Sequence, residues 1–166
     1  LKKINSDLEL IICGSYRRKK KTSGDIDILI FNKTSKLHNE KNLGDFIDQL
    51  KKNKFLVAHL TEDGKTKYMG LGRLNSQSTA RRIDIRYVKK TNLATSMLYF
   101  TGSGEFNKNM RLYAKKKGYK LNEYGLFKIG KDKELKLKTD DEKDIFNILD
   151  LDYIEPETRT DTVVSK

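Results

Sequence analysis

The chain has 166 residues, enough for one or two small domains with a hydrophobic core, and its 36% hydrophobic content is that of a soluble protein. No apolar run approaches the roughly 20 residues of a transmembrane helix, and the single cysteine, Cys13, excludes a disulfide framework and fits a reducing, intracellular compartment. The net charge is +12, with 29 basic and 12 acidic residues in positions 1–131, which favours a polyanionic partner over a merely lysine-rich surface.

The first ninety residues alternate between strand-like and helix-like patterns. A basic stretch, residues 16–23, follows Gly14 and is expected to open with a helical turn. A helix is expected over about residues 39–53, where apolar residues have helical spacing. Short apolar runs and strict alternation predict the strands, which are residues 8–13, 25–31, 54–61, 65–74 and 82–88. Glu62-Asp63-Gly64 is a hairpin signal between the third and fourth of these.

The last seventy residues repeat this mixture. Gly118 ends a predicted helix as a C-terminal glycine, and Thr139 to Glu142 has the pattern of a capping box. The expected helices are residues 93–100, 105–117 and 140–150. The expected strands are residues 119–121, 126–129 and, more weakly, 135–137. The boundary between the halves falls near Asn92, so the sequence predicts a mixed α/β, or α+β, fold in two parts, residues 1–92 and 93–166.

Three aspartates stand out against apolar strands. Asp25 and Asp27 are two residues apart on one strand, so both point to the same face while the isoleucines between them point to a core. Asp84 has the same alternation on a later strand. If the two strands are neighbours, three carboxylates converge and suit two Mg²⁺ ions for an in-line phosphoryl displacement. The alternative is that Asp84 merely pairs with Arg82 and Arg86, and that Asp25 is a turn residue.

A glycine-serine pair precedes these carboxylates. Gly14 allows a tight turn and a close approach of ligand, Ser15 adds a hydroxyl donor, and Arg18 adds a guanidinium fork. Gly24 again exposes backbone directly before Asp25. Backbone N–H groups at a helix start favour phosphate. Phosphate-binding groups and metal-binding carboxylates within a few residues are what a triphosphate carrying Mg²⁺ requires, and this pattern is typical of nucleotidyltransferases.

Several longer blocks extend the pattern, and with them the chain resembles the family X DNA polymerases, within them the polymerase beta type. LYFTGS followed by FNKNMR is far more specific than the general nucleotidyltransferase pattern. The matching blocks, in the order of the family, are GSYRR, SGDIDIL, KYMGL, RRIDIR, LYFTGSGEFNKNMR, LNEYGL and DEKDIF. The resemblance covers the palm, with a central sheet flanked by helices, and a small α+β C-terminal subdomain. The family's N-terminal lyase and helical DNA-binding segments find no match, as expected of a truncated piece or a minimal polymerase of the viral kind.

The resemblance implies a role for each matching residue. Asp25 and Asp27 match the carboxylates that bind both metal ions. Asp84 matches the one that binds only the catalytic metal and receives the proton of the primer 3′-hydroxyl, and Arg82 matches the residue that orients it. The residues that match nucleotide contacts are Gly14, Ser15, Arg18 and Gly24 for the triphosphate, Tyr99, Phe100 and Gly102 for the sugar, and Asn107 for the base. The family also carries a cis peptide at Gly102-Ser103.

The resemblance further implies DNA contacts and a switch. Arg111 matches a residue that reaches the template strand, and Lys108 and Tyr124 are expected to contact DNA as well. Arg86, Glu123 and Tyr124 match residues that exchange partners when the C-terminal subdomain closes. Two positions depart from the family: Lys19 stands where it usually has glycine, and Gly104 replaces a larger residue beside the incoming base, so base selection is expected to loosen.

The implied function is template-directed addition of a deoxynucleotide to a primer 3′-end with release of pyrophosphate, in gap filling during base excision repair. The implied cofactors are two Mg²⁺ ions, with Mn²⁺ as a substitute. The partners are gapped or primer–template DNA and a deoxynucleoside triphosphate, for a monomer without a membrane partner, in the nucleus or a viral replication compartment. Two alternatives stay open. Template-independent or RNA nucleotidyl transfer is disfavoured by FNKNMR with Arg111, and an inactive DNA-binding module is disfavoured by the intact carboxylates.

Overall fold

The structure is a computed structural model, and it describes residues 1–34, 38–61 and 64–159. These residues divide into two compact units. None of the helices in the described ranges has the length and apolar character that a bilayer-crossing segment needs.

The first unit contains the described residues of Leu1–Ile12 and Thr22–Lys90, and the second contains Cys13–Lys21 with the described residues from Thr91 onward. The chain therefore leaves the first unit after the first strand of that unit and returns to it before the second strand. The short segment between these strands belongs to the second unit, although it lies early in the sequence.

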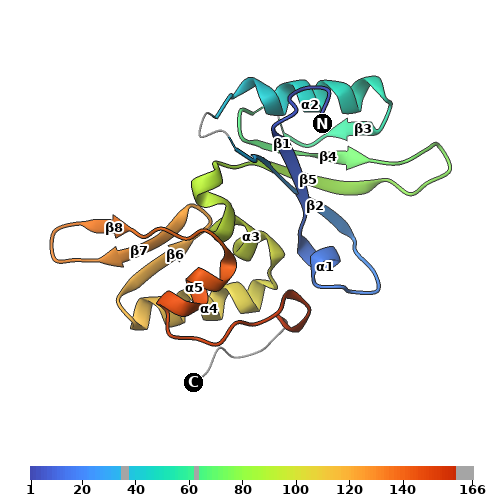
Figure 1. The fold of residues 1–166 in the computed structure, drawn as a ribbon. Coiled ribbons are helices and arrows are strands. Elements are labelled where there is room, and N and C mark those ends of the chain that lie inside the picture. Colours follow the sequence, from blue (N-terminus) through green and yellow to red (C-terminus); the bar gives the residue numbers. More distant parts are fainter. Residues whose placement is uncertain (35–37, 62–63, 160–166) are drawn as a thin grey trace. The chain divides into compact units, whose positions relative to one another are not determined.

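A five-stranded sheet is the frame of the first unit (Figure 1). Its strands lie in the order β1-β2-β5-β4-β3, and only the β2–β5 pair is parallel. The strands are β1 (Leu8–Ile12), β2 (Asp25–Asn32), β3 (Leu56–His59), β4 (Lys67–Gly72) and β5 (Arg81–Tyr87). The two aspartate-bearing strands, β2 and β5, are thus direct neighbours at the centre of the sheet.

Helix α2 (Lys41–Lys52) covers one face of this sheet. Its apolar residues recur with helical spacing, and Leu43, Phe46 and Ile47 are buried in one core with Ile83 and Ile85 of β5. The isoleucines of β2 and β5 face this core, because side chains alternate along a strand. The aspartates between them therefore face the opposite side of the sheet.

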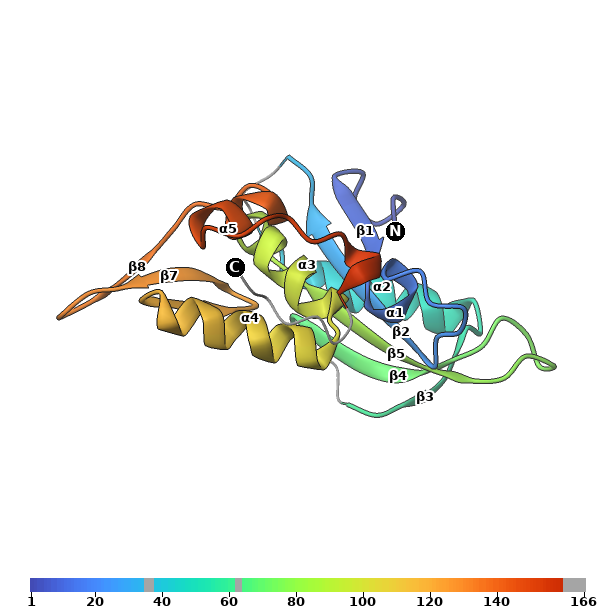
Figure 2. The ribbon, with the colours of Figure 1, turned by 90° about the horizontal axis from the view of Figure 1, so that it is seen from below.

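The second unit combines helices with a smaller sheet of order β6-β7-β8. Helix α4 lies alongside this sheet (Figure 2), and Phe106, Met110 and Ala114 from α4 share a core with Leu121 and Leu126 from the strands. The elements are α1 (Gly14–Arg17), α3 (Leu93–Thr101), α4 (Gly104–Lys116), β6 (Tyr119–Asn122), β7 (Gly125–Ile129), β8 (Glu134–Lys136) and α5 (Glu142–Ile148). Short 3₁₀ turns cover Lys90–Asn92 and Pro156–Thr158.

The predicted α+β class is confirmed, and each predicted element is present with ends shifted by a few residues. Gly118 has a φ of +85°, the left-handed conformation in which glycine ends a helix without steric cost. The predicted turn residues Glu62 and Asp63 lie outside the described residues, but β3 and β4 pair antiparallel as a hairpin requires. Cys13 is buried.

A capping box forms before α5, but two residues later than the predicted Thr139–Glu142 pattern, with Asp141 as the N-cap and Asp144 as its partner. The Asp141 carboxylate accepts a hydrogen bond from the Asp144 N–H at 3.0 Å, and the Asp144 carboxylate accepts one from the Asp141 N–H at 3.3 Å. Each side chain thus satisfies a backbone donor that the first helical turn leaves without an intrahelical partner.

We therefore expect Asp141→Ala to lower the free energy of unfolding by about 1 kcal/mol, the usual value of an N-cap side chain. Urea denaturation followed by circular dichroism measures the change. Asp140→Ala is the matched control, because the Asp140 side chain only pairs with Lys138 at the surface. Equal effects of the two substitutions would contradict the capping role.

Candidate active site

The carboxylates of the first unit share one face of its sheet. The parallel register of β2 and β5 pairs Asp27 directly with Asp84, and Asp25 with Arg82. Asp25 is exposed, whereas Asp27 and Asp84 are half-buried. The structure therefore fulfils the condition set by the sequence, that the two aspartate-bearing strands be neighbours.

Arg82 lies against Asp84 on this face. Its Nε and Nη2 atoms are each 3.4 Å from one oxygen of the Asp84 carboxylate, and its Nη2 atom also lies 4.0 Å from the Met69 sulfur. A guanidinium held on both carboxylate oxygens restricts the orientation of the carboxylate. The contact agrees with the expected orienting role of Arg82, and equally with a plain ion pair.

The donor types on this face suit a hard divalent cation, because carboxylate oxygens are the ligands that Mg²⁺ prefers. Within the described ranges, however, no three acidic, histidine or cysteine side chains gather at metal-binding separation. Asp25, Asp27 and Asp84 share a face without forming a closed ligand cluster. Like charges on neighbouring strands repel, and Arg82 offsets the charge of Asp84.

The expected triphosphate contacts of the Gly14–Arg18 segment belong to the second unit. The Arg18 Nη1 donates to the carbonyl oxygen of Thr101 at 2.5 Å, and a Cβ on Gly102 would lie 3.1 Å from the same nitrogen. Gly102 has a φ of +67°, a conformation that favours glycine, and the Arg18 nitrogen would have to shift slightly to admit a side chain. The Arg18 Nε is buried and has no hydrogen-bond partner among the described residues.

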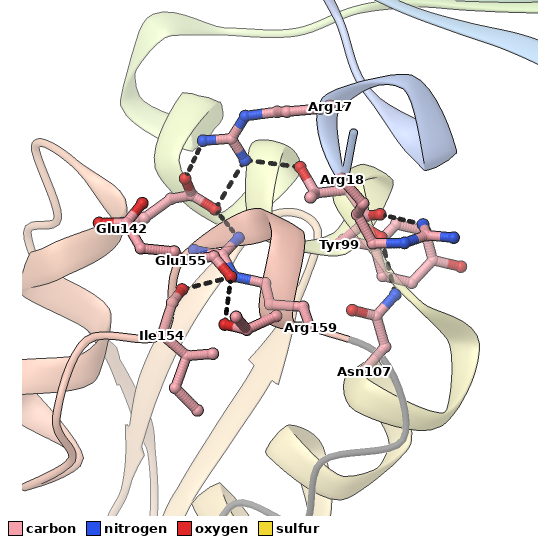
Figure 3. Close-up of polar contacts among 10 residues, drawn as sticks. Arg17, Arg18, Tyr99, Asn107, Glu142, Ile154, Glu155 and Arg159 are labelled. Atoms are coloured by element: carbon pink, nitrogen blue, oxygen red, sulfur yellow. Dashed lines mark hydrogen bonds and ion pairs between the residues drawn. The ribbon is translucent and has the colours of Figure 1, made fainter. Parts of the chain in front are cut away.

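The residues expected around the sugar and base are held together where α3 meets α4. The Asn107 side chain donates to the carbonyl oxygen of Tyr99 at 2.7 Å (Figure 3). The rings of Tyr99 and Phe100 meet edge to face with centroids 5.1 Å apart. The Gly102-Ser103 peptide between the helices is cis, as expected. Ser103 caps α4 by accepting a hydrogen bond from the Phe106 N–H.

The remaining predicted residues are spread over both units. Gly24 and Arg86 lie in the first unit, where Arg86 follows Asp84 by two residues and shares its face of the sheet. In the second unit, the Glu123 carbonyl accepts hydrogen bonds from Thr95 and Ser96, which fixes the backbone before Tyr124. The predicted DNA-contacting residues Lys108, Arg111 and Tyr124 are exposed.

A buried ion cluster that the sequence did not predict connects the elements of the second unit. Glu142, 6% exposed, accepts hydrogen bonds from Arg17 and from the fully buried Arg159, and lies between them in Figure 3. Arg17 also donates to the Thr101 hydroxyl at 2.6 Å. Three segments distant in the sequence, α1, α5 and the chain near Arg159, therefore meet at one carboxylate.

Arg159 makes further contacts along its whole length. Its Nε donates to the carbonyl of Ile154 at 2.9 Å, and its own carbonyl accepts from the Ser103 N–H at 3.1 Å. Its guanidinium lies 5.5 to 5.7 Å from three ring centroids, a separation at which cation–π attraction acts. The rings are those of Phe106, Phe146 and Tyr153.

The cluster changes the ionisation of its neighbours. Burial alone lowers the pKa of Arg17, but the hydrogen bond and the charge of Glu142 outweigh it, so the pKa of this guanidinium is raised. Burial raises the pKa of the Tyr153 hydroxyl, and the negative charge of Glu142 adds to the effect. Both groups therefore stay in their protonated forms at neutral pH.

Sequence reasoning reached only part of this cluster. Arg17 and Glu142 lie inside matching blocks, GSYRR and DEKDIF, but no pattern in the sequence pairs them. Arg159 stands in an acidic, polar stretch that contains no apolar periodicity, so nothing in the sequence indicates that it is buried.

The structure also shows the surroundings of Lys19 and Gly104, the two positions at which the sequence departs from the family. Lys19 has a φ of +57°, a left-handed conformation uncommon for a residue with a side chain, which explains why glycine is usual there. Its ammonium pairs with Glu157 at 2.9 Å, and this hydrogen bond raises the Lys19 pKa. A Cβ on Gly104 would meet no described atom within 4 Å, so packing does not require glycine at that position.

Comparison with known proteins agrees with this geometry. A family model for the DNA polymerase beta palm matches residues 1–90, and one for the DNA polymerase beta thumb matches residues 96–160. The two matches together take in most of the chain, and the family expected from the sequence is confirmed.

Curated relatives point to the same family. DNA polymerase lambda of Rattus norvegicus is 38% identical over 170 residues, which cover 93% of this chain and 29% of the relative. DNA polymerase lambda of Arabidopsis thaliana is 32% identical over 167 residues, covering 90% and 31%. DNA polymerase IV of Saccharomyces cerevisiae is 36% identical over 93 residues, covering 56% and 15%. The chain thus spans less than a third of the length of these relatives.

The buried cluster predicts a large loss of stability when its carboxylate is neutralised. Glu142→Gln keeps the shape of the side chain but leaves Arg17 and Arg159 without a counter-ion, so we expect the free energy of unfolding to fall by about 3 kcal/mol. Urea denaturation measures this loss. Glu134→Gln is the control, because Glu134 pairs with Lys120 at the surface, where ion pairs contribute little. A loss at Glu142 no larger than at Glu134 would contradict the analysis.

Proposed function

Since the chain belongs to the DNA polymerase beta family, the family X DNA polymerases, we propose that it adds a deoxynucleotide to the 3′-end of a primer under the direction of a template. Pyrophosphate is the leaving group. The observation that carries the proposal is the register of β2 and β5, which pairs Asp27 with Asp84 and puts Asp25 on the same face of the sheet.

Asp25, Asp27 and Asp84 would hold the Mg²⁺ ions of this reaction, or Mn²⁺ in their place. When bound, two such ions lower the barrier by stabilising the attacking and the leaving oxygen. The chain's own contribution is acid–base chemistry and orientation. The Asp84 carboxylate accepts the proton of the primer 3′-hydroxyl, and Arg82 on both of its oxygens keeps it oriented for that transfer.

In this proposal the incoming nucleotide engages Gly24 of the first unit and several residues of the second unit. The partly exposed Arg18 side chain is anchored through Nη1, and its guanidinium is a charged donor for a phosphate oxygen. Ser15 donates its hydroxyl to the same triphosphate, and the backbone N–H groups of Gly14 and Gly24 are further donors for it. Tyr99, Phe100 and Gly102 form the surface against the sugar, and Asn107 reaches the base.

Template contacts and a closing step complete the proposal. Arg111, Lys108 and Tyr124 contact DNA from their exposed positions. Arg86 lies on the face of β5 that carries Asp84. When the nucleotide binds, Arg86 leaves Asp27 and binds Glu123 and Tyr124 instead. We assign residues 1–92 to the catalytic palm and residues 93–166 to nucleotide selection, and place the activity in the filling of short gaps during base excision repair.

Asp84→Ala is expected to abolish primer extension and to leave nucleotide binding within a few-fold, because Asp25 and Asp27 would still hold the ion that accompanies the triphosphate. Extension is measured on a gapped duplex with Mg²⁺, and nucleotide binding by fluorescence titration. Asp48→Ala, on the exposed side of α2, is the control and should behave as the parent. Undiminished extension by Asp84→Ala would rule the mechanism out, and extension of a lone single strand by the parent would favour template-independent transfer.

Arg86→Ala tests the closing step. If Arg86 exchanges partners during closure, its removal changes the nucleotide-dependent rate of single-turnover extension while the affinity for DNA stays the same. A fluorescent base analogue in the template follows closure directly. Lys67→Ala, at the position of β4 paired with Arg86, is the control for loss of a cation from the same part of the sheet. Parent-like kinetics for Arg86→Ala would refute the switch.

A further inference from the structure

The hairpin of β7 and β8 is exposed over its whole distal part. Every residue from Lys128 to Lys136 is exposed, and both views show this ribbon extending away from α3 and α5 of its own unit (Figures 1 and 2). A hydrogen bond from the Gly130 N–H to the Lys133 carbonyl, 2.9 Å, closes the turn at its tip. The tip carries Lys131 and Lys133 with the exposed Asp132 between them, so its net charge is positive by one.

The end of α4 lies beside the base of this ribbon. The Ile129 N–H donates to the carbonyl of Gly118 at 3.0 Å, and Tyr119 pairs with Lys128 in the sheet. The lysines that close α4 therefore lie near the base of the ribbon, and Lys131 and Lys133 lie at its tip. We call the six exposed residues Lys115, Lys116, Lys117, Lys128, Lys131 and Lys133 the lysine surface.

Most of these cations have no ion-pair partner among the described residues. Of the other lysines nearby, Lys120 of β6 pairs with Glu134 of the hairpin, and Lys136 donates to the Asn92 side chain. Lys117 lies over the Tyr113 ring at 5.6 Å. Among the described residues, the other members of the lysine surface form no ion pair. Helix C-termini favour cations, which accounts for the lysines of α4 but not for those of the ribbon.

We propose that the lysine surface binds the phosphate backbone of duplex DNA. The proposal rests on the proposed function, which makes DNA the polyanion at hand, and adds a contact surface made of residues other than those assigned to the nucleotide, the template or the metal ions. Lysine acts as a point charge on phosphates and not as a reader of base edges, so the contact is independent of sequence. A two-stranded ribbon is also narrow enough to follow a groove of the duplex.

The test is the affinity of the full 166-residue chain for a fluorescent gapped duplex, measured by anisotropy at salt concentrations from about 50 to 200 mM. Lys131→Glu with Lys133→Glu should weaken binding by roughly tenfold at the lowest salt and lower the slope of log affinity against log salt by about 2, one for each phosphate that the variant no longer neutralises. The matched control is Lys41→Glu with Lys52→Glu on α2, which makes the same change in net charge at exposed positions.

The outcomes separate this inference from the proposed function. Ribbon and control variants with equal affinities and equal salt slopes would overturn the inference while primer extension by the parent still upholds the function. A change in oligomeric state in place of DNA affinity would also overturn it. A parent that binds DNA through the ribbon but extends no primer would uphold the inference and reject the function. If charge reversal lowers the melting temperature, Lys131→Gln with Lys133→Gln gives the same comparison, with the same fall in salt slope and a smaller loss of affinity.

Discussion

The second unit depends on one carboxylate, that of Glu142, held between Arg17 and Arg159. Burying these charges costs solvation free energy, which is recovered only when each ion has a partner and its remaining polar atoms have hydrogen bonds. Two arginines share the single negative charge, and Thr101, Ile154 and three aromatic rings supply the other contacts. The Arg159 Nη2, buried without a partner among the described residues, marks where this compensation is incomplete.

The segment from Thr101 to Ser103 is fixed from two sides by this cluster. Arg17 and Arg18 bind the hydroxyl and the carbonyl of Thr101, and the Arg159 carbonyl accepts the Ser103 N–H. The turn between α3 and α4 is therefore positioned by α1 and by the chain near Arg159 as much as by its own helices. The residues proposed to contact the sugar and base are therefore positioned in part by the ion cluster at Glu142, although no member of that cluster is proposed to contact the nucleotide.

The sequence predicted most of the fold because local patterns determine it. Alternation defined β2 and β5, helical spacing defined α2, and Gly118 ended α4, each through an interaction between residues close in the chain. The parallel pairing of β2 with β5 was stated only as a condition, because strand order depends on contacts between distant segments. The cluster at Glu142 was not predicted for the same reason, since its partners Arg17 and Arg159 lie 125 and 17 residues away in the sequence. In addition, nothing in the sequence distinguishes a buried arginine from an exposed one.

The segment Cys13–Lys21 belongs to the second compact unit although its place in the sequence, between two strands of the first unit, suggests otherwise. It leaves the sheet after β1 and returns three residues before Asp25, yet its contacts are with the second unit. Hydrogen bonds from Arg17 and Arg18 to Thr101 contribute to this, together with two ion pairs. Arg17 is bound through the buried Glu142, and Lys19 pairs at the surface with Glu157, two residues before Arg159. The surface pair is exposed on both sides and weak in water, so the buried cluster and the hydrogen bonds to Thr101 are what retain the segment. In consequence, Ser15 and Arg18, proposed to bind the triphosphate, belong to the same compact unit as the residues proposed for the sugar and base. Gly24 and the carboxylates proposed for the metal ions belong to the other unit.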